Sequence, residues 1–275
     1  MKGFFEAIVS ALRRIWNAYT IEAFKAAKLK FTYLGPALVV ATVCSATLLH
    51  KVTRDDISDY PFIAKTTPLA INLVGAFMLI LFCSGLMSKE LSSGTIRLVL
   101  VRPLRRWEFL AAKLLLGMSY AVLLSALGAA TSWGIAGLFG DLEGVTFGGE
   151  LIYTGAAMAR AYLFGLVLGF FPLFAAVAYA VFISGCTRST GAAVGSAVGI
   201  WIVADTVKSF VGLENFVFST YLETPWQRFA DLCDGIDVAS WADKTTLLCV
   251  ATSVVSFAIF TGVAGVILAR RDLHA

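Results

Sequence analysis

The chain has 275 residues, of which 59% are hydrophobic and only 15% are charged, and its formal net charge is +4. Because about a quarter of the residues in soluble domains are charged, this composition and a mean hydropathy of +0.82 exclude an ordinary soluble protein and predict an all-α integral membrane protein. No phosphate-binding loop of the form G-x-x-x-x-G-K-S/T occurs, so any ATP hydrolysis is expected on a separate chain.

The first 30 residues are expected to form amphipathic helices. Glu6, Arg13 and Arg14 interrupt the apolar core that a signal peptide would need. Apolar residues recur at three- and four-residue spacing, which is typical of a helix in the membrane interface and disfavours the alternative, a solvated basic tail. We expect a break near Tyr19, with Thr20 as a helix cap. The apolar positions are Phe5, Ile8, Leu12, Ile15, Trp16 and Tyr19.

Residues 31–275 are expected to form one membrane domain with six spanning helices. A helix of about 20 residues crosses the ~30 Å hydrocarbon core of a bilayer. Six nearly uncharged runs meet this requirement, the fifth only if it extends through Asp205 and Lys208. The predicted spans are about 31–50, 66–88, 109–140, 160–187, 189–211 and 245–269.

A polar stretch with internal order lies between the second and third predicted spans. Glu90 ends a helix-compatible run, Gly94 permits a break, and Thr95 can cap a new helix. A short apolar segment that carries Arg97 follows, and Pro103 stops it. A plain basic loop would explain the charges but not this order. The sequence therefore predicts a short helix that a soluble partner can grip.

These residues resemble the signature of the type-2 ABC transporter permeases, the membrane subunits of ATP-driven exporters. The motif occupies the stretch 88–113, and the six-span layout extends the resemblance to nearly the whole chain. It implies that the short helix is a cytoplasmic coupling helix between spans two and three, and that segment 1–30 contains the elbow helix before span one. The matching residues are Glu90, Gly94, Thr95, Arg97, Pro103, Arg106 and Lys113.

The resemblance also implies partners and a location. Two copies of an ABC ATPase subunit would dock on the coupling helices and would bind ATP and Mg, while this chain would bind no cofactor. A second permease chain, identical or related, would complete the export pathway, and membrane lipids would surround the spans. Nucleic acid is not an expected partner. The expected location is the plasma (inner) membrane of a prokaryote, and the substrate stays open.

The placement of Lys and Arg predicts the orientation. With the N-terminus in the cytoplasm, 15 of the 22 Lys and Arg residues fall on the cytoplasmic side, and most of the 18 acidic residues fall outside. We therefore expect a multi-pass protein with both termini in the cytoplasm. The aromatic-rich segment 212–244 is then outside, where we expect short helices at the outer membrane surface.

Three ionisable residues near the outer ends of spans are candidates for an outer gate or a substrate contact, because charges at membrane depth are often functional. They are Arg160, Asp205 and Lys208. The alternative is that they only snorkel to the interface. Asp205 and Lys208 are three residues apart and could form a pair. We also expect Arg160 to lie close to Asp205, since opposite charges would lower each other's burial cost.

Gly191, Gly195 and Gly199 lie on one face of the fifth span and predict close approach of another helix. That helix could belong to the same subunit, or the face could line a subunit interface or the transport pathway.

Neither a catalytic site nor a metal site is predicted. The two histidines, His50 and His274, are not placed to activate a buried nucleophile, and no metal-ligand spacing occurs. We therefore expect a transporter subunit rather than an enzyme. The alternative is a secondary transporter or a membrane scaffold without an ATPase partner. The lack of charge near the middle of any span weighs against carboxylate-coupled secondary transport.

Overall fold

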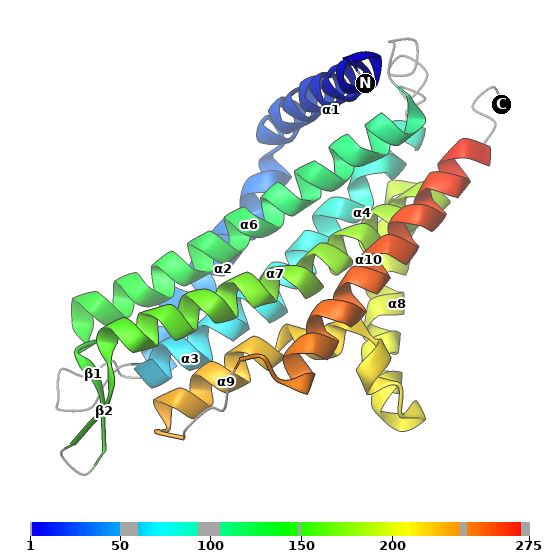
Figure 1. Cartoon of the computed structure of the whole chain (residues 1–275). Helices are drawn as coiled ribbons and strands as arrows, with labels where there is room; N and C mark the ends of the chain where they lie inside the picture. The colour runs from blue at the N-terminus through cyan, green and yellow to red at the C-terminus, as the bar shows by residue number, and fades with distance from the viewer. Residues whose placement is uncertain (1, 50–59, 93–104, 148–149, 237–240, 271–275) are drawn as a thin grey trace.

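The computed structural model describes residues 2–49, 60–92, 105–147, 150–236 and 241–270. The described chain is a bundle of long helices with a β-hairpin at one end (Figure 1). Within these residues, six helical stretches are long and apolar enough to cross a membrane, which confirms the all-α membrane class and the six spans. The six are Lys30–Leu48, Tyr60–Ser92, Arg106–Phe139, Gly155–Cys186, Thr190–Val211 and Lys244–Arg270.

The second span differs most from its predicted limits, because it begins at Tyr60 rather than at residue 66. It is built from three consecutive helices, of which the middle one, η1, is a π-helix. The helices of the described chain are α1 (Lys2–Ala27), α2 (Lys30–Leu49), α3 (Tyr60–Pro68), η1 (Leu69–Gly75), α4 (Ala76–Ser92), α6 (Arg106–Phe139), α7 (Gly155–Cys186), α8 (Thr190–Val211), η2 (Glu214–Phe216), η3 (Phe218–Leu222), α9 (Thr224–Cys233) and α10 (Lys244–Arg270).

The core of the bundle is built around α7, which packs against α4, α6, α8, α9 and α10. About two thirds (67%) of an 18-residue apolar segment of α7 is buried, against 11% for the peripheral α8. Gly117 lets α6 approach α4 and α7, because a Cβ atom there would lie 2.5 Å from Val177 Cγ1 and 2.9 Å from Cys83 Sγ. These distances are shorter than van der Waals contact, so only glycine fits without movement.

The short helices of the segment 212–244 pack against one end of the spans, as expected from its aromatic residues. Trp226 and Phe229 of α9 are buried and contact the ring of Tyr162 on α7. The π-helix η1 joins this assembly, because the side-chain amide of Asn72 donates to the Leu222 carbonyl of η3 at 2.7 Å. That this end faces outward stays a prediction.

One local prediction was wrong, and one local feature was not predicted. The helix α1 runs through the expected break near Tyr19 to Ala27, because the Thr20 hydroxyl donates to the Asn17 carbonyl at 2.9 Å instead of capping a new helix. The otherwise all-α chain also contains a hairpin that was not expected. Its strands pair antiparallel and are β1 (Gly144–Phe147) and β2 (Glu150–Thr154).

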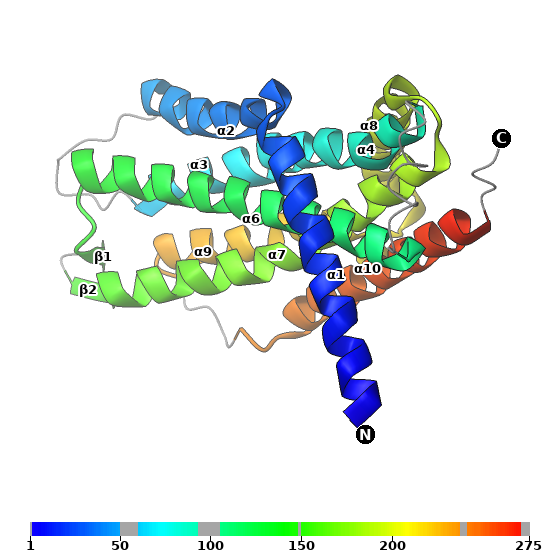
Figure 2. The same ribbon diagram turned by 90° about the horizontal axis from the view of Figure 1, so that it is seen from above.

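The two ends of the described chain lie at the same end of the bundle. Figure 1 shows the start of α1 and the end of α10 at the end where α4 ends and α6 begins, opposite the hairpin, although Figure 2 shows that the two lie well apart. Figure 2 shows α1 crossing over α6 near the start of that helix. An even number of spans places both ends of the chain on the same side of the membrane, and the positive-inside rule predicts that this side is cytoplasmic.

Candidate functional site

Glu90 and Arg106 lie on either side of the predicted coupling helix. Glu90 is in the last turn of α4, and Arg106 is the first residue of α6. The other predicted coupling residues lie outside the described residues, and they are Gly94, Thr95, Arg97 and Pro103.

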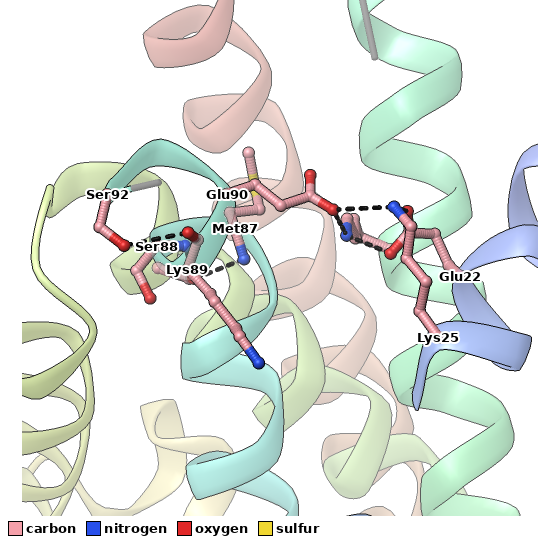
Figure 3. A network of polar contacts seen from close by, with 9 residues as sticks. Glu22, Lys25, Met87, Ser88, Lys89, Glu90 and Ser92 are labelled. Atoms are coloured by element: carbon pink, nitrogen blue, oxygen red, sulfur yellow. Dashed lines mark hydrogen bonds and ion pairs between the residues drawn. The ribbon is translucent and has the colours of Figure 1, made fainter. Parts of the chain in front are cut away.

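Glu90 belongs to a cluster of four charged side chains that joins α4, α6 and α1. The ammonium group of Lys113 on α6 pairs with Glu22 Oε2 on α1 and with Glu90 Oε1 at 2.9 Å. Lys25 Nζ on α1 pairs with Glu22 Oε1 at 2.7 Å and with Glu90 Oε1 at 3.4 Å. Figure 3 shows Glu22, Lys25 and Glu90 pointing toward one another from the two helices. The two positive and two negative charges balance.

The cluster is mostly withdrawn from solvent. Lys113 is 1% exposed, Glu22 7% and Glu90 9%. Burial acts to raise the pKa of Glu22, but Lys113 and Lys25 outweigh this effect and hold the pKa below its usual value. Lys113 also lies over the ring of Phe109, 5.1 Å from its centroid. Buried charges are tolerated only when they are paired, so each member of the cluster fixes the position of the others.

A second ion pair connects α1 to the start of α6. Arg14 donates from Nη2 and Nε to Glu108 Oε1 at 2.7 and 2.9 Å. The other carboxylate oxygen of Glu108 accepts the backbone N–H of Arg105 at 2.9 Å, which satisfies a free donor where α6 begins. The fully buried Glu108 therefore both caps α6 and anchors α1.

Arg106 connects the start of α6 to the end of the last span. Its Nη1 atom donates to the carbonyl oxygens of Leu268 and Ala269 at 2.7 and 2.8 Å. The last carbonyls of a helix have no partner within the helix, and a cationic side chain satisfies them well. Arg106 thus holds α10 beside the entry to α6.

Together these contacts attach both flanks of the predicted coupling helix to other parts of the chain. The end of α4 is tied to α1 and α6, while the start of α6 is tied to α1 and α10. The sequence analysis missed Arg14, Glu22, Lys25 and Glu108 as members of this site. The available signal was the occurrence of acidic residues among the basic ones in segments 1–30 and 88–113.

At the other end of the bundle, Asp205 forms the expected pair with Lys208. Lys208 Nζ lies 2.6 Å from Asp205 Oδ1, which also accepts from the Ser219 hydroxyl at 2.7 Å. The expected proximity of Arg160 to Asp205 is wrong for this structure. Arg160 Nε donates instead to the Ala156 carbonyl one turn earlier in α7, and no ion pair joins Arg160 and Asp205, both of which are described.

The glycine face of α8 has no close neighbour in the described part of the chain. A Cβ atom on Gly195 or Gly199 would meet nothing within 4 Å, and one on Gly191 would meet only the nearby Ser189 hydroxyl at 3.9 Å. Packing against the described residues of the same chain therefore does not account for these glycines.

Within the described residues, no group of three or more His, Cys, Asp or Glu side chains is arranged to hold a metal ion.

A family model described as ABC-2 family transporter protein matches residues 5–273. Comparison with curated proteins gave no match.

Proposed function

Because the chain belongs to the ABC-2 family of transporter proteins, and is therefore an ABC permease, we propose that it forms an export pathway with a second permease chain and is driven by separate ATPase subunits. Two ATPase copies bind ATP and Mg, and this chain itself catalyses no reaction. The protein lies in the inner membrane of a prokaryote with both termini in the cytoplasm.

The attachment of Glu90 and Arg106 supports a coupling role for the residues between them. A force that an ATPase applies between Ser92 and Arg105 reaches α1 through Lys113 and α10 through Arg106. Gly94, Thr95, Arg97 and Pro103 supply the docking surface. Glu90 and Arg106 attach the docking surface to the rest of the permease, because their described contacts are made to this chain's own helices.

The second permease chain packs against the glycine face of α8. That face is open in the single chain, and glycines at four-residue spacing allow two helix backbones to approach closely. Replacing Gly195 with Leu should leave the fold of the single chain intact, because nothing lies within 4 Å. It should weaken the association of two permease chains, which crosslinking in membranes would measure.

Membrane lipids contact α1 on the side away from α6. Leu12, Trp16 and Phe24 are 60, 61 and 72% exposed there, and an amphipathic helix with such residues rests in the interface.

At the outer end, Asp205 and Lys208 hold α8 to Ser219 of η3, which makes this contact a candidate outer gate. Arg160 is an exposed candidate for substrate contact.

Purification of the chain with the ABC ATPase encoded beside it tests the function. We expect a stable complex that hydrolyses ATP. Arg97→Ala and Gly94→Val should reduce the amount of ATPase retained. Arg188→Ala is the matched control, because Arg188 is a basic residue in another loop on the same predicted side. A wild-type chain that retains no ATPase would refute the proposal and would favour a secondary transporter or a scaffold.

A further inference from the structure

Ser184, near the end of α7, accepts two backbone hydrogen bonds from α4. The N–H groups of Met87 and Ser88 both lie 2.9 Å from its hydroxyl oxygen, and its side chain is fully buried. In an uninterrupted α-helix, these two groups donate to the carbonyls of Cys83 and Ser84. Here both groups lie inside α4, which runs unbroken from Ala76 to Ser92, so the Ser184 oxygen is an acceptor from outside the helix, in the way that a serine cap serves the first turn of a helix.

Backbone carbonyl groups in the same part of α4 accept hydrogen bonds from other serine hydroxyls. Ser88 Oγ donates to the Ser84 carbonyl at 2.9 Å, and Ser84 Oγ donates to the Leu81 carbonyl at 3.0 Å. Serine hydroxyls that bond back to the preceding turn tend to bend helices. Ser184 and these hydroxyls therefore offer additional partners to two N–H groups and two carbonyl groups of this part of α4.

The last turn of α4 is held from two sides. Ser184 holds its start against α7, where the sulfur of Met87 lies 3.8 Å from the position that a Cβ atom on Gly185 would take. Glu90 holds its other side against Lys113 on α6. The segment that leads into the predicted coupling helix is therefore fixed by two neighbouring helices as well as by its own backbone.

We propose that Ser184 is a positioning residue for coupling, an inference that rests on the proposed function. The Ser184 hydroxyl holds the last turn of α4 from α7, and this turn pivots there when an ATPase moves the coupling helix. During the pivot, the N–H groups of Met87 and Ser88 leave Ser184 and are satisfied by the carbonyls of their own helix. Each N–H keeps a partner, so the exchange avoids the cost of a buried unpaired donor. The pivot changes how Glu90 reaches Lys113.

Hydrogen exchange on the purified full-length chain, without ATPase, tests the hydrogen bonds. The variants are Ser184→Ala, Ser184→Thr, which keeps the hydroxyl, and Ser253→Ala, a control serine of α10 that is 1% exposed. In Ser184→Ala we expect the amides of Met87 and Ser88 to exchange about tenfold faster, because both lose an acceptor. The other two variants should match the wild type. Wild-type exchange in Ser184→Ala, or equal acceleration in Ser253→Ala, would overturn the proposal.

ATP hydrolysis by the complex then tests the positioning role. Ser184→Ala should retain as much ATPase as the wild type but hydrolyse ATP at least about fivefold more slowly, within the usual range of coupling effects, and Ser184→Thr should restore the rate. Wild-type hydrolysis in Ser184→Ala would reduce the hydroxyl to a structural contact and overturn the positioning role. If the wild-type chain retains no ATPase, the proposed function fails and the coupling role fails with it, whereas the exchange result still reports on the Ser184 bonds.

Discussion

Replacing Lys113 with Met should strongly destabilise the protein. Methionine has similar length but no charge, so Glu22 and Glu90 would stay buried without their main partner. Breaking a buried ion pair by removing one member costs about 3–5 kcal/mol. Lys25 still reaches both carboxylates, but its side chain is 51% exposed, so its compensation is worth at most about 1 kcal/mol.

We therefore expect a loss of about 3 kcal/mol in the free energy of unfolding. For a chain of this size the Tm falls by about 2–4 °C per kcal/mol, which predicts a decrease of about 6–12 °C. Thermal unfolding in detergent at a fixed heating rate measures it. Adding Glu22→Gln and Glu90→Gln to Lys113→Met should recover at least half of the loss, because no uncompensated charge then stays buried.

The matched control is Lys208→Met, which removes the same charge from an ion pair whose carboxylate is 48% exposed. It should cost less than about 1 kcal/mol. Equal Tm values for Lys113→Met and Lys208→Met, or additive effects in the triple variant, would show that the cluster does not hold α1 to α4 and α6.

Three further outcomes are expected. Gly117→Ala should lower the free energy of unfolding by about 1–3 kcal/mol through overpacking, whereas Gly134→Ala, where a Cβ meets nothing within 4 Å, should not; chemical denaturation compares them. The pKa of Glu22 is lower in the folded state than its usual value of 4.5, so Glu22 stabilises the fold above pH 4.5, and this contribution is lost as the pH falls below 4.5. When Tm is measured against pH, the decrease below pH 4.5 should therefore be less steep in Glu22→Gln than in the wild type. For the orientation, Cys233 is a poor probe, since it is buried and burial raises its pKa to about 12; an impermeant thiol reagent should instead label Gln227→Cys on intact cells, and protection of that exposed position would reverse the predicted topology.

The spans were predictable because each is a local property of the sequence. A run of apolar residues long enough to cross a bilayer has few alternatives to a helix. Where the chain uses local chemistry in an unusual way, the prediction failed. Thr20 looks like a cap but bonds within the helix, and the hairpin was overlooked although β-branched and aromatic residues stand on both sides of Gly148-Gly149, a recognised hairpin signal.

The polar site was predictable only in part, because its members meet across long stretches of sequence. Glu90 and Lys113 were recognised from their motif, but Glu22 pairs with a residue 91 positions away, and nothing local indicates that partner. The pair of Asp205 and Lys208 was found because the two lie on one helix face. Arg160 and Asp205 were matched only by expected depth, which says nothing about position around the bundle.

The π-helix η1 sets the rotational phase between the two halves of the second span. Each residue advances an α-helix by about 100°, and a π-helical turn accommodates an additional residue. Faces assigned by i, i+4 spacing in α3 therefore do not continue into α4. If the seven residues of η1 adopted α-helical geometry, the additional residue would turn α4 by about a quarter turn relative to α3, whereas deleting one residue there would let the span form a regular α-helix with α4 in its present phase. After such a turn, Asn72 would lose its alignment with Leu222, or Glu90 would be carried away from Lys113. The π-helical geometry of this short segment thus allows the contact in the middle of the span and the contact at its end to be made at the same time.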